Sequence, residues 1–412
     1  MNSTKISIWD LPDDIVYVDL NPEFKRQLFL SAKKSGNWRE LSKILNIGLI
    51  HLEGILHKNK KIKLRIIKRL FELAGINKAE IERNIFLIAL GTNGGVKFAN
   101  AIINPRLPFD FNTIDGARVI SSLFFDGGID SDLYPHYRNQ NIELRKKVYE
   151  SYTNLFGEFK GKFTNYKDRE QIYLPRVVGI ILTQCLGLIP GRKTITNPKV
   201  PSFTIDGSRE LKSVFLQQAF DDEGHFNKSL KGIEFKLANG LFANKSEHEF
   251  IVKNDVEEYA PNLIKDVKKL IESFDIRVSK LYCADIYQTK DGRYNSRWKF
   301  RICGRKNLEI FQNEINFISD YKRNDLKKGI ESIKFDYYPK NESEKIIYNA
   351  CVNLQKKEGK ITSRTLAKEI SRSQILAKKM IHKFVKEGLL KVSKEKWGVK
   401  GAEYLVNEDI GK

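Results

Sequence analysis

The chain of 412 residues has only four cysteines, and none of them stands in a CxxC pair. Cys185, Cys283, Cys303 and Cys351 are widely spaced, so the sequence supports neither a zinc ribbon nor a disulfide framework. No run approaches the roughly eighteen apolar residues that a membrane-spanning helix needs. The first residues also lack the basic segment and apolar core of a secretion signal. We therefore expect an intracellular, soluble protein of the cytoplasm with no membrane partner.

Acidic residues are also in the minority. Aspartate and glutamate number 51 against 72 lysines and arginines, which gives a formal net charge of +21. Such an excess attracts polyanions, and nucleic acid is the first partner to consider. The alternative is a lysine-rich solvated surface, and charge alone does not separate the two. The 41% of hydrophobic residues can build cores, and the length predicts two to four domains.

Residues 34–80 contain three segments with the apolar spacing of helices, and we expect residues 1–33 to form an N-terminal arm before them. The second segment, Leu49–His57, is the candidate recognition helix of a helix-turn-helix. The basic run HKNKKIKLR follows it and suits phosphate contacts. Its candidate DNA-binding residues are Lys58, Lys60, Lys61 and Arg65. A plain three-helix bundle with a solvated basic face is the alternative.

Between about residues 96 and 333 one order of elements occurs twice, in halves of about 112–200 and 208–333. Each half opens with an apolar helix that ends on an acid and a glycine, then continues with a short strand, a charged helix and a further helix. Asn93–Gly95, just before this region, predicts a hairpin turn. The repeat predicts two pseudo-symmetric halves in a mixed α+β fold.

The two opening helices end on the carboxylates Asp126 and Glu223, and the next residues are Gly127 and Gly224. Glycine permits a sharp turn into the following strand. A carboxylate at the negative end of a helix costs roughly a few tenths of a kcal/mol, so the position favours a compensating cation. If the two helices pack side by side, both carboxylates meet at one point and can hold divalent metal ions.

Residues 341–412 predict a compact basic module in the order of a winged helix. Thr362 is the expected cap of one helix, a second helix follows, and two strands flank a turn at Gly398–Gly401. The candidate DNA-binding residues here are Lys378, Lys379 and Lys396. Winged helices also serve as protein-contact modules, which is the alternative.

The stretches VISSLFFDG (Val119–Gly127) and LQQAFDDEG (Leu216–Gly224) resemble the paired motifs of LAGLIDADG homing endonucleases in the double-motif, single-chain form. Asp126 and Glu223 fall on the acidic eighth position, and both glycines fall on the ninth. The resemblance covers residues 96–333, and the N-terminal segment resembles that of archaeal members with an added DNA-binding domain. At the third motif position, where the family favours small residues, Ser121 is small but Gln218 is not.

The resemblance implies two αββαββα halves whose four-stranded antiparallel sheets form a saddle over double-stranded DNA. Asp126 and Glu223 would be catalytic metal ligands for Mg²⁺ (or Mn²⁺), and the candidate catalytic basic residues are Lys193 and Lys322. The implied activity is site-specific hydrolysis of DNA phosphodiester bonds by a monomer. Two alternatives stay open, a catalytically silent transcription regulator on the same scaffold and an RNA intron maturase.

Overall fold

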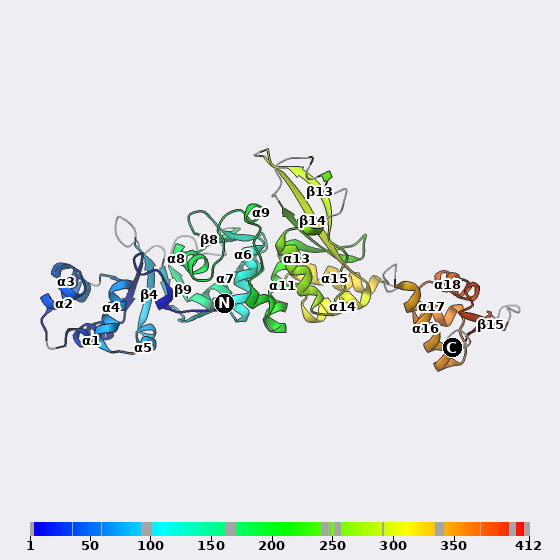
Figure 1. Cartoon of the computed structure of the whole chain (residues 1–412), viewed down its shortest axis with the longest axis horizontal. Coiled ribbons are helices and arrows are strands. Elements are labelled where there is room, and N and C mark those ends of the chain that lie inside the picture. The colour runs from blue at the N-terminus through cyan, green and yellow to red at the C-terminus, as the bar shows by residue number, and fades with distance from the viewer. Residues whose placement is uncertain are drawn as a thin grey trace.

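The computed structural model describes residues 4–34, 36–58, 60–91, 101–160, 170–239, 246, 249–250, 257–290, 292–333, 342–370, 372–394 and 401–407. Helices and several small antiparallel sheets make it an α+β protein. The molecule is elongated, with the N-terminal helices at one end and the C-terminal helices at the other (Figure 1). Among the described helices, none is both long and apolar enough to cross a membrane. The predicted turn at Asn93–Gly95 lies outside the described residues.

Residues 4–33, which belong to the segment predicted as an N-terminal arm, form regular elements that contact later parts of the chain. Strand β2 (Val16–Leu20) pairs with β4 (Ile85–Leu90), and helix α1 (Pro22–Lys33) packs on α4 (Leu64–Ala74). The reason is hydrophobic, because the side chains of Val16, Val18 and Leu20 on β2 are fully buried. Shorter elements complete the segment: β1 (Lys5–Ile6) and η1 (Ile8–Asp10).

The helices predicted within residues 34–80 are present. They are α2 (Trp38–Ile44), α3 (Leu49–His57), α4 and, beyond them, α5 (Lys78–Arg83). Asn37 and Glu40 form a reciprocal capping box at the start of α2, and Gly75 ends α4 in the left-handed conformation. The same region contains a five-stranded sheet in the order β3-β2-β4-β5-β9, and α4 contacts its strands β2 and β3. Its remaining strands are β3 (Ile62–Lys63), β5 (Ala101–Ile103) and β9 (Glu158–Lys160).

The first half of the repeat is built around helix α6 (Ile114–Phe124) and a sheet in the order β10-β8-β7. The sheet has three strands in the described part rather than the expected four, because β9 pairs with β5 of the N-terminal sheet. The other elements of this half are β6 (Phe109–Asp110), β7 (Gly127–Ile129), β8 (Pro135–Arg138), α7 (Ile142–Phe156), β10 (Gln171–Tyr173), α8 (Arg176–Ile180) and the π-helical turn η2 (Ile181–Cys185).

The second half is built around helix α11 (Arg209–Glu223) and has a four-stranded sheet in the order β11-β12-β14-β13. Two short helices, α9 (Lys193–Thr196) and α10 (Ser202–Ile205), lead into it. The β13 and β14 strands extend far beyond the rest of the sheet (Figure 1). The elements of this half are β11 (Gly224–Asn227), β12 (Gly232–Asn239), η3 (Glu257–Tyr259), α13 (Asn262–Glu272), β13 (Tyr282–Gln288), β14 (Tyr294–Cys303), α14 (Arg305–Glu314) and α15 (Asp320–Ser332).

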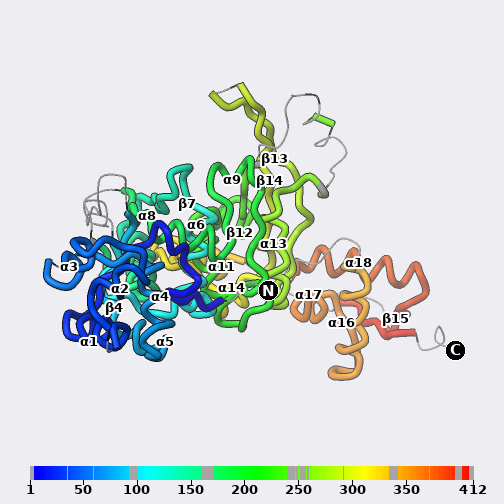
Figure 2. The backbone as a smooth tube through the Cα atoms, turned by 60° about the vertical axis from the view of Figure 1, so that its left-hand side comes forward, coloured from blue at the N-terminus to red at the C-terminus, as the bar shows by residue number. Residues whose placement is uncertain are grey.

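The C-terminal module has its own hydrophobic core, separate from the one that runs through both halves and the N-terminal helices. It contains α16 (Ser343–Glu358), α17 (Ser363–Glu369), α18 (Gln374–Lys386), β15 (Leu390–Lys394) and β16 (Glu403–Val406). The predicted cap is confirmed, because the Thr362 hydroxyl accepts a hydrogen bond from the Thr365 amide. The module stands apart at one end of the molecule in a second view also (Figure 2).

Candidate active site

Helices α6 and α11 pack against each other in the middle of the molecule. The Ser121 hydroxyl of α6 donates a 2.7 Å hydrogen bond to the backbone carbonyl of Phe215 on α11. Both Ser121 and Gln218 are fully buried. A small side chain on α6 thus lets the partner backbone come within hydrogen-bond distance. Each helix also starts alike, with Thr113 or Ser208 as its N-cap.

The two acids of the repeat lie where these helices end. Glu223 is the last residue of α11, and Asp126 directly follows the C-cap of α6. Gly127 and Gly224 then begin strands β7 and β11. A Cβ on Gly127 would lie 2.5 Å from the backbone oxygen of His136, and one on Gly224 would lie 2.7 Å from the Phe220 ring. Both positions therefore require glycine for lack of space.

The two candidate basic residues hold the ends of these helices. The Lys193 ammonium donates hydrogen bonds to the backbone carbonyls of Phe125 and Gly127, the second at 2.9 Å. The Lys322 ammonium donates to the carbonyls of Phe220, Asp221 and Gly224. Each lysine thus satisfies carbonyls that a helix end leaves without partners and offsets the negative end of the helix. Neither is a solvated surface charge, because Lys322 is buried and Lys193 is half-buried.

The electrostatics of the acids reflect their burial and their proximity. Desolvation raises the pKa of Glu223 to about 7, with a further contribution from the charge of Asp126. Desolvation also raises the pKa of Asp126, against a 2.7 Å hydrogen bond that its carboxylate accepts from Asn139. Burial lowers the pKa of Lys193 and of Lys322, although the surrounding carboxylates oppose that shift. Burial therefore favours the uncharged forms of these acids and of both lysines, and the opposite charges nearby counteract it only in part.

Asp222 is a third acid of this site, which the sequence motif did not single out for a role. The Tyr137 hydroxyl on β8 donates a 2.7 Å hydrogen bond to it, and the Gln218 amide donates at 3.0 Å. Desolvation, followed by the charge of Asp126, raises the pKa of Asp222 well above its ordinary value. Because Tyr137 belongs to the first half and Asp222 to the second, this contact joins the two halves. The only sequence signal was the acidic run DDE before Gly224.

Gln218, the unexpected residue at the helix crossing, belongs to the same network. Its amide nitrogen donates to the Tyr137 hydroxyl at 3.0 Å as well as to Asp222. Its side-chain oxygen is buried without a hydrogen-bond partner. The large side chain is therefore accommodated as a bridge between the halves, at the cost of one unsatisfied acceptor.

Asp221, the acid two residues before Glu223, holds a neighbouring segment of the backbone. Its carboxylate accepts hydrogen bonds from the backbone amides of Ile318 and Ser319. These two residues directly precede helix α15, which carries Lys322. Asp221 therefore fixes the helix that brings the lysine to the end of α11.

An open hollow of about 800 Å³ lies beside the acids. Its lining includes the carboxylates of Asp126 and Asp222 and the cations of Arg138 and Lys322, whereas Glu223 does not line it. Since both carboxylates and cations face the hollow, it can take a group with negative charge and a metal ion together. Within the described residues, no three His, Cys, Asp or Glu side chains gather closely enough to hold a metal ion by themselves.

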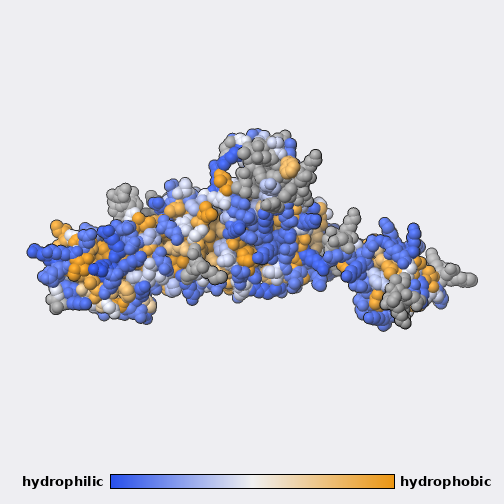
Figure 3. Space-filling model, in the orientation of Figure 1, coloured by the Kyte–Doolittle hydropathy of each residue, from blue (hydrophilic) through white to orange (hydrophobic). Residues whose placement is uncertain are grey.

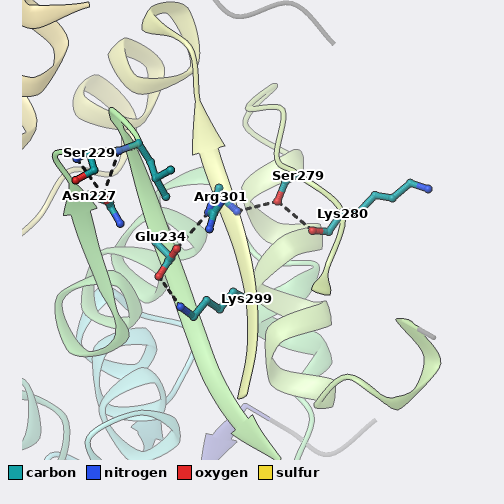
Figure 4. Close-up of polar contacts among 8 residues, drawn as sticks. Asn227, Ser229, Glu234, Ser279, Lys280, Lys299 and Arg301 are labelled. Atoms are coloured by element: carbon teal, nitrogen blue, oxygen red, sulfur yellow. Dashed lines mark hydrogen bonds and ion pairs between the residues drawn. The ribbon is translucent and has the colours of Figure 1, made fainter. Parts of the chain in front are cut away.

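The outer face of the second sheet is polar and cationic, while its inner face is apolar. Burial alternates along β14, with Trp298, Phe300 and Ile302 fully buried. Glu234 on β12 lies between Lys299 and Arg301 of β14, at 2.9 and 3.2 Å (Figure 4). The outward row also holds His225, Lys236, Tyr282 and Arg297. On this face Arg301 lies over the Tyr282 ring and Arg297 over the Tyr287 ring.

The first sheet presents a smaller face of the same kind. Tyr137 and Ile172 point inward and are fully buried, whereas His136, Arg138, Gln171 and Tyr173 occupy the other side. Much of the molecular surface in one orientation is hydrophilic, over the central region and over the C-terminal module (Figure 3). The sheets therefore offer two polar faces, one from each half.

The remaining predicted DNA-binding residues differ in their exposure. Lys58, Lys60, Arg65, Lys378 and Lys379 are exposed. Lys396 lies outside the described residues.

Lys61 needs a correction as a predicted phosphate contact. Its ammonium forms an ion pair with the buried Asp19, which also pairs with Lys25 at 2.9 Å. Only 11% of the Lys61 side chain is exposed. Its charge offsets a buried carboxylate instead of facing solvent.

A scan of the chain against protein-family models gave no match, and a search among curated proteins gave none either.

Proposed function

We propose that the chain is a site-specific, metal-dependent DNA endonuclease of the LAGLIDADG kind. The observation that carries the proposal is the pair of acids, Asp126 and Glu223, at adjoining ends of two packed helices, each followed by a spatially required glycine. Raised pKa values on both acids favour occupation by a cation that neutralises them. An ordinary helix end has no reason to gather such a charge.

The repeated strand order supports the same proposal. In each half the strand after the central helix pairs with the next strand, and that strand pairs with one from beyond the charged helix: β7-β8-β10 in the first half and β11-β12-β14 in the second. The polar outer faces of these sheets suit the grooves and phosphates of a duplex. Two halves in one chain would provide one acid for each DNA strand.

The residues present fit a divalent metal ion. Mg²⁺ is commonly held by one or two carboxylates together with substrate phosphates and water, so Asp126 and Glu223 suffice when DNA supplies oxygens. Such an ion, when bound, stabilises charge on a phosphoryl oxygen and favours ionisation of water. The side chains of Asp126 and Glu223 would hold it. Lys193 and Lys322 would act as positioning residues, because they fix the backbone on either side of both acids.

The experiment that tests the proposal is selection on randomised duplex DNA with Mg²⁺, with sequencing of both bound and cut molecules. The Glu223→Gln variant is run in parallel, with Glu331→Gln, an exposed acid of α15, as the matched control. We expect cleavage at one long site with the intact chain and the control, and none with Glu223→Gln. Selective binding without cutting, unchanged in the variant, would instead identify a transcription regulator. Preference for structured RNA would favour the maturase alternative.

A further inference from the structure

Two isoleucines stand out on the surface of the described residues. Ile50 is 82% exposed and Ile375 is 83% exposed, more than any other large hydrophobic side chain there. An exposed isoleucine forgoes the favourable free energy of burying its side chain, so two such residues call for an explanation.

The two residues occupy the same position in two similar motifs. Ile50 is the second residue of α3, which follows α2, and Ile375 is the second residue of α18, which follows α17. In both pairs four residues connect the helices, 45–48 in the first and 370–373 in the second. A connection of that length between two helices is typical of helix-turn-helix units. The equivalent residue at the start of a recognition helix is one that contacts base edges.

The surroundings of Ile375 favour DNA over a protein partner. The inward face of α18 buries Ala377, Met380, Ile381 and Phe384. Its outward face carries Gln374, Lys378, Lys379, His382 and Lys386, all exposed and none acidic. The apolar surface of one isoleucine among cations is too small for a protein interface. It is large enough to contact a single methyl group in the major groove of DNA, whose phosphates would attract the surrounding cations.

The surroundings of Ile50 are similar but less basic. Leu52 and Ile55 anchor α3, while His51, next to Ile50 in the chain, and His57 and Lys58, at the far end of the helix, are exposed. The exposed Glu53 is an acid on the same helix. The two helix pairs, α2 with α3 and α17 with α18, lie at opposite ends of the molecule, and the sheets of the two halves lie between them (Figure 1).

We propose that α3 and α18 enter the major groove at the two ends of one DNA site, where Ile50 and Ile375 each contact the 5-methyl group of a thymine. Thymine is the only standard DNA base with such a methyl group, so each isoleucine would specify one base pair. The inference rests on the proposed binding of duplex DNA, but it does not depend on cleavage.

The test removes the methyl group alone. After selection of the bound sequence, each outer thymine is replaced in turn by deoxyuridine, and the affinity of the intact chain is measured with Ca²⁺ in place of Mg²⁺. We expect about fourfold weaker binding at one position near each end, the loss that one buried methyl group implies. Ile375→Ala and Ile50→Ala should each weaken binding to the thymine site similarly, with no further loss on the matching deoxyuridine site. Leu30→Ala, a half-exposed residue of α1 outside both motifs, is the control.

The outcomes separate this inference from the proposed function. A footprint confined to the centre of the site, with affinity unchanged by every outer deoxyuridine and by both isoleucine variants, would overturn the inference and leave the nuclease proposal standing. Absence of binding to any duplex by the intact chain would overturn both.

Discussion

Helices α6 and α11 both lead into an acid followed by a glycine, although Glu223 is the last residue of α11 and Asp126 lies beyond the C-cap of α6, and the side chains at their crossing differ. Both ends are followed by a glycine without room for a Cβ, and both are held by a lysine that donates to backbone carbonyls. At the crossing, Ser121 bonds to the partner backbone, while Gln218 reaches Tyr137 in the other half. The comparison indicates that helix ends repeat because each half has the same backbone requirement. At the crossing the side chains of one helix contact the other half, so the two helices carry different residues that fit each other.

The largest expected effect concerns the acids themselves. If the two ends are equivalent, Asp126→Asn and Glu223→Gln should each lower the cleavage rate by about 100-fold or more, because each removes a ligand for the metal that stabilises charge. The rate on each DNA strand is measured separately with end-labelled duplexes. Loss of cutting on one strand only, by either variant, would show that the halves act independently. Equal activity of both variants and the intact chain would refute the assignment of the acids.

The second effect compares the lysines. Lys322→Met should lower the free energy of unfolding by about 3 kcal/mol, since it leaves three carbonyls of the α11 end without a charged donor. Lys193→Met should cost about 2 kcal/mol, because that lysine donates to two carbonyls instead of three. Urea unfolding measures both losses, and the dependence of the free energy of unfolding on urea concentration should be the same in the variants as in the intact chain. Lys328→Met, an exposed lysine of α15, serves as control. Costs equal to that of the control would mean that the lysines do not hold the helix ends.

The third effect is a pH dependence of stability. Because the pKa of Glu223 in the folded chain is about 7, against an ordinary 4.5, the folded chain holds more protons between those values. Stability should therefore fall as pH rises through that window. Glu223→Gln should reduce this fall, of which the raised pKa values of Asp126 and Asp222 leave a part, and should stabilise the metal-free protein above pH 7 by roughly 1–3 kcal/mol, while it abolishes cleavage. Unfolding curves at several pH values, in the presence of chelator, measure it. Destabilisation of this variant at pH 8 would contradict the raised pKa.

Much of this arrangement could be predicted from the sequence, for identifiable reasons. Periodicity and caps predicted α3 and the Thr362 cap correctly, since both depend on neighbouring residues. The acids and glycines were found because they recur at matching positions.

Long-range contacts were not accessible in this way. The pairing of β2 with β4, the ion pair of Lys61 with Asp19, and the contact of Tyr137 with Asp222 join residues far apart in the chain. Nothing in the local pattern around Lys61 distinguishes it from the exposed Lys60. Only the fold decides which of two adjacent lysines faces a buried carboxylate.

The smallest expected effect tests whether the two glycines are truly equivalent. In Gly127→Ala the new Cβ meets the backbone oxygens of His136 and Ser122, at 2.5 and 2.6 Å, and these belong to a strand and a helix that cannot easily move. In Gly224→Ala the nearest atom belongs to the Phe220 ring, which can rotate slightly. Both should destabilise the chain, and the first by about 1 kcal/mol more than the second. Thermal unfolding of the two variants, beside Gly401→Ala with open space around it, measures the difference. A larger loss for Gly224→Ala would mean that the packing around Phe220 is the stiffer of the two, and that the halves differ in their backbone surroundings as well as in their crossing side chains.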